Sequence, residues 1–109
     1  MGLDITIKEV EEIICPGCGR PVTTKDMDEV DSGGRIWYEF LERVGYYVPY
    51  DQRDETNDWY GEDMTLTSEQ TQALFNFVER EKPYPARDLS VVISHALASG
   101  NKIVINADW

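Results

Sequence analysis

The residues with the clearest chemical potential are two cysteines at a C-x2-C spacing, Cys15 and Cys18, separated by Pro16 and Gly17. Zinc ribbons present two thiolates from a tight turn of this kind, whereas a closed structural zinc site has four ligands. The chain has no further cysteine and a single histidine, His95. We therefore expect the pair either to bind zinc with ligands from elsewhere or to remain as a turn without metal.

Three sources could complete a zinc site at Cys15 and Cys18. Carboxylates follow the turn at Asp26 and Asp28, and His95 could supply a nitrogen. A symmetric homodimer would contribute two thiolates from each chain, and thiolates suit zinc better than exposed carboxylates do. A redox pair is a further alternative. The C-x2-C pairs of thioredoxin-like enzymes depend on a helix N-terminus, however, and the residues after Cys18 favour a strand.

A second candidate site is the aromatic and acidic segment 46–63. Tyr and Trp give rigid contact area with a polar tip, and carboxylates attract a basic partner. The residues predicted to bind such a partner are Tyr47, Tyr50, Asp54, Glu55, Asp58, Trp59 and Tyr60. One alternative is that the aromatic side chains pack the segment onto the core. Another is a calcium loop, but the order of ligands along the segment does not fit an EF-hand.

Composition limits the classes of partner. The chain has 109 residues, 21 of them acidic and 10 basic, and a formal net charge of −11. Nucleic acids and anionic membranes are disfavoured as direct partners because binding to either needs a basic face, so the charge favours basic protein surfaces. No apolar run approaches the length of a bilayer span, and the start of the chain lacks a signal-peptide pattern. We expect a cytoplasmic protein with reduced thiols.

Signatures of catalysis are missing from the sequence. With one histidine there is no Ser/His/Asp order to consider, and neither a G-x-G-x-x-G motif nor a P-loop occurs. We therefore predict that the protein is not an enzyme. An enzyme of unrecognised type stays as an alternative, since acidic residues are numerous enough to form an acid/base pair in the folded chain.

The N-terminal third of the chain is predicted to form a hairpin followed by a loop. Apolar and polar residues alternate over 3–8, and β-favouring residues follow the cysteine turn at 20–24, so the turn lies at the tip of a hairpin. The segment 26–34 is predicted to be an acidic loop. Asp31 or Ser32 at its end could cap the next helix.

The rest of the chain predicts three helices and a strand. The helices span about 34–44, 67–82 and 89–99, the second opened by a capping box at Thr67 and the third capped by Asp88. Alternation over 102–109 indicates a final strand. The predicted fold class is α+β: a small antiparallel sheet, formed by the N-terminal hairpin and the C-terminal strand and covered by about three helices. Residues 1–109 are predicted to form a single domain.

The opening Met-Gly-Leu-Asp-Ile-Thr, residues 1–6, resembles the start of a group of small proteins encoded by bacteriophages and prophages. A Ser-Gly-aromatic stretch at 32–38 and a closing strand with an acidic residue at 105–109 are similar to the same group. The resemblance implies a viral accessory protein inside a bacterial host. It does not include the cysteine turn, and because the group has no assigned activity it brings no functional residue with it.

These features predict a non-enzymatic, phage-type accessory protein. It would bind a basic surface of a host protein through its acidic, Tyr/Trp-rich face, as a counter-defence factor or a mimic of nucleic-acid charge. The alternative is a small zinc-knuckle protein, structural or dimer-forming, that uses Cys15 and Cys18.

Overall fold

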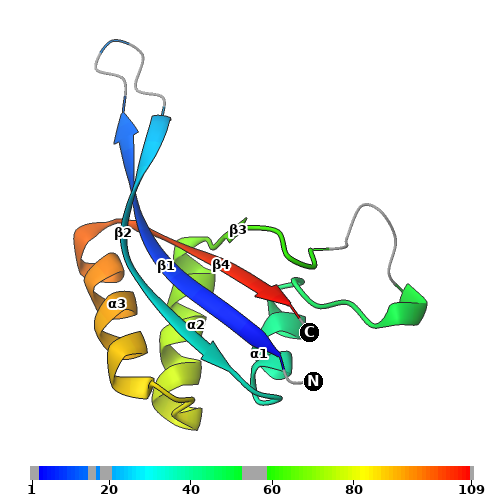
Figure 1. Cartoon of the computed structure of the whole chain (residues 1–109). Coiled ribbons are helices and arrows are strands. Elements are labelled where there is room, and N and C mark those ends of the chain that lie inside the picture. Colours follow the sequence, from blue (N-terminus) through cyan, green and yellow to red (C-terminus); the bar gives the residue numbers. More distant parts are fainter. Residues whose placement is uncertain (1–2, 15–16, 18–20, 53–58, 109) are drawn as a thin grey trace.

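The computed structural model describes residues 3–14, 17, 21–52 and 59–108, which form an α+β fold (Figure 1). Four strands and three α-helices occur in the described part of the chain, together with a short 3-10 helix at Tyr50–Gln52. In chain order the strands and α-helices are β1 (Asp4–Ile14), β2 (Pro21–Gly33), α1 (Trp37–Arg43), β3 (Met64–Thr65), α2 (Ser68–Glu81), α3 (Ala86–Ser99) and β4 (Lys102–Asp108). The predicted fold class is confirmed.

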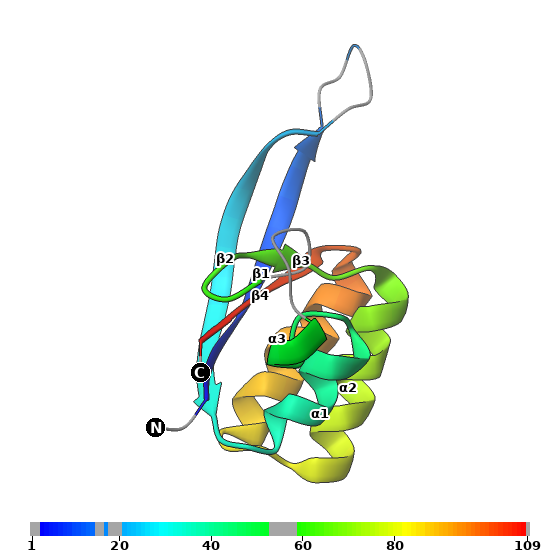
Figure 2. The ribbon, with the colours of Figure 1, turned by 90° about the vertical axis from the view of Figure 1, so that its right-hand side faces the viewer.

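The sheet is antiparallel throughout and has the strand order β2, β1, β4, β3. The first and the last of these strands in the sequence are therefore the two inner strands, and β2 and β3 form the edges. All three α-helices lie against the same face of the sheet, and none of the described helices lies on the opposite face (Figure 2). Strands in a sheet with one covered face are expected to alternate apolar and polar side chains.

This alternation along β1 and β4 explains where the core lies. On β1, Ile5 and Ile7 are buried against the helices, whereas Thr6 and Lys8 are partly exposed on the other face. The helices contribute one apolar stripe each to the same core. Their buried side chains are Trp37, Phe40, Leu41, Leu74, Phe77, Val78, Leu89, Val92, Ile93 and Ala96.

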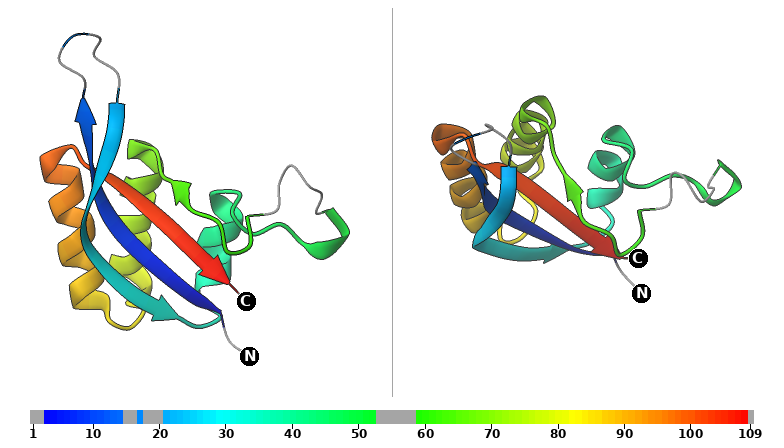
Figure 3. Two further views of the ribbon diagram at one scale, coloured as in Figure 1. Left: turned by 45° about the horizontal axis from the view of Figure 1, so that its top comes forward. Right: turned by 90° about the horizontal axis from the view of Figure 1, so that it is seen from above.

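Strands β1 and β2 form the predicted hairpin, which reaches beyond the helices (Figures 1 and 3). β4 pairs with β1 from Asp4 to Val10, whereas β1 continues to Ile14 and pairs there with β2. Cys15 and Cys18, in the turn that joins the two strands, lie outside the described residues. The zinc site, the redox pair and the cysteine-linked homodimer therefore stay predictions.

The sequence predicts an acidic loop over 26–34, but residues 26–33 form the second half of β2, so this prediction is wrong. A bulge interrupts the pairing of the two strands: Lys8 pairs with Glu29, but Val10 pairs with Asp26. The extra residue on β2 shifts the alternation of its side chains and hides the period of two that marks a strand. Acidic residues are tolerated here because β2 is an edge strand beside a face without helices.

The end of β2 is shaped by two glycines. A Cβ atom on Gly33 would lie 2.7 Å from the carbonyl oxygen of Leu3, which is closer than a side chain allows. The next residue, Gly34, has a φ of 110° and donates its N–H to the same oxygen at 2.9 Å. The pair of glycines therefore lets the chain turn tightly against β1 before α1 begins.

The predicted capping box of α2 is present. The hydroxyl of Thr67 accepts a hydrogen bond from the N–H of Gln70 at 3.1 Å, and Gln70 Oε1 accepts one from the N–H of Thr67 at 2.9 Å. Helices α1 and α3 also end as predicted, where Gly45 and Gly100 adopt positive φ. Local capping chemistry thus sets most helix ends.

The predicted starts of α1 and α3 are wrong. Asp31 and Ser32 belong to β2, and α1 begins at Trp37 without a side-chain cap. The hydroxyl of Ser32 instead accepts a hydrogen bond from Trp37 Nε1 at 3.0 Å. α3 begins directly after Pro85, so Asp88 lies in its first turn, where a carboxylate still interacts favourably with the helix dipole.

Tyr46 joins the loop after α1 to the last strand. Its side chain is 1 % exposed, and its hydroxyl donates to the carbonyl of Glu62 at 2.7 Å and accepts from the N–H of Ala107 at 2.8 Å. Burial raises the pKa of this hydroxyl above its ordinary value of 10.0. The neutral phenol is therefore the form that the folded chain stabilises.

This environment predicts a specific loss of stability at alkaline pH. Because the pKa of Tyr46 is raised in the folded state, its contribution to the free energy of unfolding is complete below pH 10.0 and is lost as the pH rises further. Tyr46→Phe should lower this free energy by about 1–3 kcal/mol at neutral pH, since a buried N–H and a carbonyl lose their partner. In urea titrations at several alkaline pH values, the wild type should lose stability more steeply than Tyr46→Phe. The control is Tyr84→Phe, because Tyr84 is 88 % exposed; equal slopes for wild type and Tyr46→Phe would contradict the assignment.

Candidate functional site

The face of the sheet opposite the helices, here called the open face, is the largest set of polar side chains that the strands bring together. It consists of Asp4, Thr6, Lys8, Val10 and Glu12 on β1, Asp26, Glu29 and Asp31 on β2, Asp63 and Thr65 at β3, and Lys102, Val104, Asn106 and Asp108 on β4. Seven carboxylates stand against two lysines in this set. The open face is therefore acidic, in keeping with the charge of the whole chain.

Two shallow hollows adjoin each other on the open face, with volumes of about 200 and 190 Å³. The first is lined by Thr6, Lys8, Glu29, Asp63, Val104 and Asn106. The second is lined by Lys8, Val10, Glu12, Asp26, Asp63, Thr65 and Val104. Because Lys8, Asp63 and Val104 line both, the two hollows form one continuous depression across β2, β1 and β4.

The centre of this depression combines an apolar base with a charged rim. Val10 and Val104 are 4 % and 8 % exposed although no helix covers them, so the surrounding side chains bury them. Lys8 Nζ lies 3.5 Å from Asp26 Oδ1, and this ammonium is the only basic group among the described side chains that line the hollows. The other carboxylates of the rim are therefore available to bind a cationic group of another molecule.

Hydrogen bonds hold two of the carboxylates in place. The hydroxyl of Thr6 donates to Asp31 Oδ1 at 2.8 Å, across the β1–β2 pair. The side-chain amide of Asn106 donates to Asp63 Oδ1 at 2.9 Å and to the carbonyl of Gly61 at 3.0 Å. Neither contact neutralises the charge, so the acidic character of the open face is kept while its shape is fixed.

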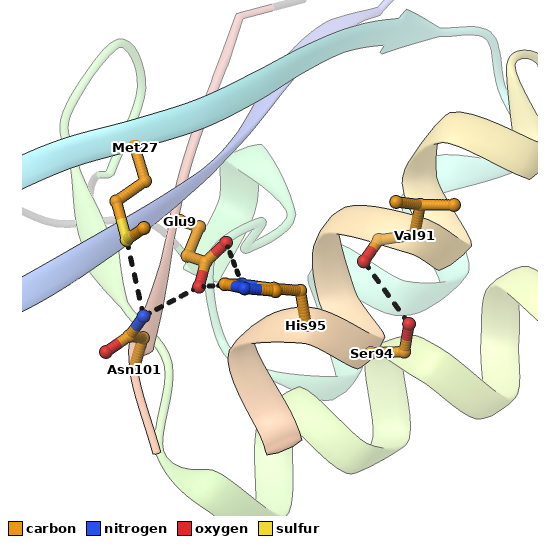
Figure 4. Close-up of polar contacts among 6 residues, drawn as sticks. All are labelled: Glu9, Met27, Val91, Ser94, His95 and Asn101. Carbon is orange, nitrogen blue, oxygen red and sulfur yellow. Dashed lines mark hydrogen bonds and ion pairs between the residues drawn. The ribbon is translucent and has the colours of Figure 1, made fainter. Parts of the chain in front are cut away.

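A second polar cluster lies on the opposite, helix-covered face. Glu9 continues the inward series of Ile5 and Ile7 on β1 and is 1 % exposed. Both of its carboxylate oxygens are bound: His95 Nδ1 lies 2.9 Å from Oε1 and 2.7 Å from Oε2, and Asn101 Nδ2 donates to Oε2 at 2.7 Å (Figure 4). A buried carboxylate is tolerated because each oxygen has a partner.

The bulge between β1 and β2 lies at Glu9 and completes this cluster. Met27, on the bulged part of β2, places its sulfur 3.3 Å from the side-chain nitrogen of Asn101 (Figure 4). Asn101 follows the end of α3, where its N–H donates to the carbonyl of Ala96 at 3.0 Å. The cluster thus joins β1, β2, the end of α3 and the start of β4.

The chemistry available to this cluster is limited. His95 is 55 % exposed, and the hydrogen bonds that the structure gives its ring are to the Glu9 carboxylate rather than to a hydroxyl or thiol nucleophile. Among the residues that the structure describes, no group of three or more His, Cys, Asp or Glu side chains could hold a metal ion. We therefore interpret Glu9, His95 and Asn101 as a tie between the sheet and α3.

The residues that the sequence singles out for partner binding are only partly described. Asp54, Glu55 and Asp58, like Cys15 and Cys18, lie outside the described residues. The side chain of Tyr50 also lies outside them.

The three remaining aromatic residues of that set can be placed. Tyr47 is half-buried and meets the ring of Tyr38 edge to face at 4.8 Å, and Trp59 is half-buried at 6.2 Å from the ring of Tyr46. Tyr60 is 49 % exposed. Tyr47 and Trp59 thus pack against the core, as the alternative reading of this segment expects, and Tyr60 keeps accessible surface.

No family model matches the chain, and neither a curated protein nor a solved structure matches it. The described helices include none that is both long and apolar enough to cross a membrane. The assignment of a site therefore depends on the geometry above.

The tie between the sheet and α3 predicts that substitutions of Glu9 and His95 are energetically coupled. His95→Ala should lower the free energy of unfolding by about 1–3 kcal/mol, because it leaves one side of the buried Glu9 carboxylate without a partner. In a Glu9→Gln background the same substitution should have a smaller effect. Urea denaturation of the four proteins measures this coupling. Val91→Ala serves as the control, since Val91 precedes His95 by one helical turn and is 59 % exposed; strictly additive effects of the Glu9 and His95 changes would refute the tie.

Proposed function

We propose that this protein is a non-enzymatic binding protein that captures a basic surface of another protein on its open face. The observation that carries the proposal is the continuous depression over Val10 and Val104, whose rim holds Glu12, Glu29 and Asp63 against the single ammonium of Lys8. A lysine or arginine side chain suits such a site, since its aliphatic stem can cover the valines while its charged head meets the carboxylates.

The proposal keeps the kind of protein predicted from the sequence but moves the binding surface. The sequence predicts the aromatic segment 46–63 as the surface, but three of its aromatic side chains, Tyr46, Tyr47 and Trp59, pack inward. The open face offers more aligned carboxylates, fixed on strands rather than on a loop, and strands hold side chains in place with less loss of conformational entropy on binding. In the bacteriophage setting that the sequence resemblance implies, the partner would be a basic host protein.

Charge complementarity also accounts for the choice of partner class. With a net charge of −11, the chain repels nucleic acids and anionic lipids and attracts cationic proteins over distances up to the Debye length. On the open face the negative charges surround an apolar base, so a partner is bound at a defined position in addition to being attracted by the net charge. Binding should therefore depend on where the negative charges lie as well as on how many there are.

A comparison of two charge-matched variants tests the proposal. The first neutralises four carboxylates of the open face: Glu12→Gln, Asp26→Asn, Glu29→Gln and Asp63→Asn. The second neutralises four exposed carboxylates elsewhere: Glu42→Gln, Asp51→Asn, Glu69→Gln and Asp88→Asn. The probe is a fluorescein-labelled peptide of alternating Lys and Thr, about ten residues long, which matches the length of a β-strand.

Fluorescence anisotropy at low ionic strength should show a loss of affinity of about tenfold or more for the open-face variant, since each exposed ion pair contributes roughly 0.2–1 kcal/mol. The variant neutralised elsewhere should lose much less. Circular dichroism confirms that both variants keep the fold. Equal losses for the two variants would mean that net charge alone determines binding, and absence of binding to the wild type would refute the proposed function.

A further inference from the structure

Strand β2 forms a long edge whose outer side borders no other strand in the described part of the chain. It spans Pro21–Gly33, has 13 residues and pairs with β1 alone. Figure 3 shows this edge at the rim of the sheet, on the side away from β4. An edge of this kind presents a row of N–H and C=O groups to which an extended chain can be added as a further strand.

The hydrogen-bond pattern identifies which backbone groups face outward. Gly34 donates its N–H to the carbonyl of Leu3 at 2.9 Å, so these two residues form a hydrogen-bonded pair. In an antiparallel ladder such pairs alternate with pairs that are not bonded to each other. The register Thr6 with Asp31 and Lys8 with Glu29 therefore places the N–H and C=O groups of Glu29 and Asp31 on the free side of β2.

The side chains of β2 determine which strands can be added. Asp26, Asp28, Glu29 and Asp31 are all exposed. Lys25 is the one basic residue of β2 itself, and Lys8 on β1 lies 3.5 Å from Asp26. A second copy of β2 would place carboxylates opposite carboxylates, which is unfavourable across a strand pair. An extended segment rich in Lys or Arg would instead place opposite charges side by side along the whole edge.

The same edge adjoins the acidic depression. Glu29 lies on the free edge through its backbone and lines the first hollow through its side chain. Successive side chains of a strand point to opposite faces, so every second side chain of an added strand would lie over the open face beside Glu29 and Asp31. Backbone pairing and charge recognition can thus be made by one extended segment.

We propose that the partner binds as an extended, Lys- or Arg-rich segment that adds a fifth strand along the outer edge of β2. The inference rests on the proposed function and specifies its binding mode. The regular pairing of residues 4–8 with 29–33 supplies an uninterrupted ladder on which the segment can align. The bulge nearer the hairpin tip and the acidic side chains disfavour neutral or acidic strands, so the edge is selective rather than generally adhesive.

Amide hydrogen exchange followed by NMR tests this binding mode with internal controls. In the free protein the outward N–H groups of Glu29 and Asp31 should exchange faster than those of Val30 and Ser32, which point to β1. Saturation with the unlabelled Lys-Thr peptide should slow exchange at Glu29 and Asp31 by about tenfold or more, and should leave Val30 and Ser32 little changed. Unchanged exchange at Glu29 and Asp31, with binding confirmed by anisotropy, would overturn strand addition and leave the proposed function standing.

A second experiment changes the peptide and leaves the protein intact. A Lys-Thr peptide with N-methyl groups on alternate backbone nitrogens keeps its charge but loses the donors of one edge. Two such peptides, methylated on the odd or the even positions, cover both alignments, and at least one should bind about tenfold more weakly than the unmethylated peptide. Equal affinity of all three peptides would overturn strand addition. Failure of the unmethylated peptide to bind would overturn both the binding mode and the proposed function.

Discussion

Each side chain of β1 must point either to the helices or to the open face, because a strand alternates with a period of two and β1 has neighbours on both sides. The inward series of Leu3, Ile5 and Ile7 supplies the centre of the core. The outward series, with Lys8 and Val10, supplies the base of the acidic depression. A shift of one residue in the pairing of β1 would therefore exchange the core for the binding surface, so both depend on one register.

Glu9 is the one buried charged residue in the inward series of β1, and three structural features accommodate its carboxylate. A bulge in β2 lies opposite it, and His95 on α3 and Asn101, between α3 and β4, supply its hydrogen-bond partners. A buried carboxylate with two partners gives a directional contact where apolar packing would not. It thus fixes the position of α3 along the sheet at the point where the hairpin leaves the body of the protein.

The helices and the two inner strands could be predicted because each signal is local. The capping box at Thr67, the apolar stripes of the helices and the alternation on β1 and β4 are all read from neighbouring residues. The second half of β2 could not be predicted in this way. Its bulge places Met27 and Val30, three residues apart, on the same side of the strand, so the period of two is lost. Bulges depend on pairing with another strand, which a single segment does not reveal.

The open face was missed for a related reason. Glu12, Glu29 and Asp63 lie far apart in the sequence, and only the register of β1 with β2 and β4 brings them around one depression. The sequence favours the segment 46–63 as a binding surface because its aromatic and acidic residues lie close together along the chain. A tyrosine in a loop gives no sequence signal that separates packing from recognition, and Tyr46 and Tyr47 pack inward here.

The position of β4 has a consequence for the order in which the chain can fold. β4 is the last of the described elements, yet it lies between β1 and β3 and pairs with both. Until residues 102–108 are available, the hairpin and β3 have no strand to connect them, and the inner faces of the helices have only part of their sheet to cover. A nascent chain therefore carries exposed apolar surface until β4 has been synthesised, and the core closes in one long-range step that joins Asp4 to Asp108.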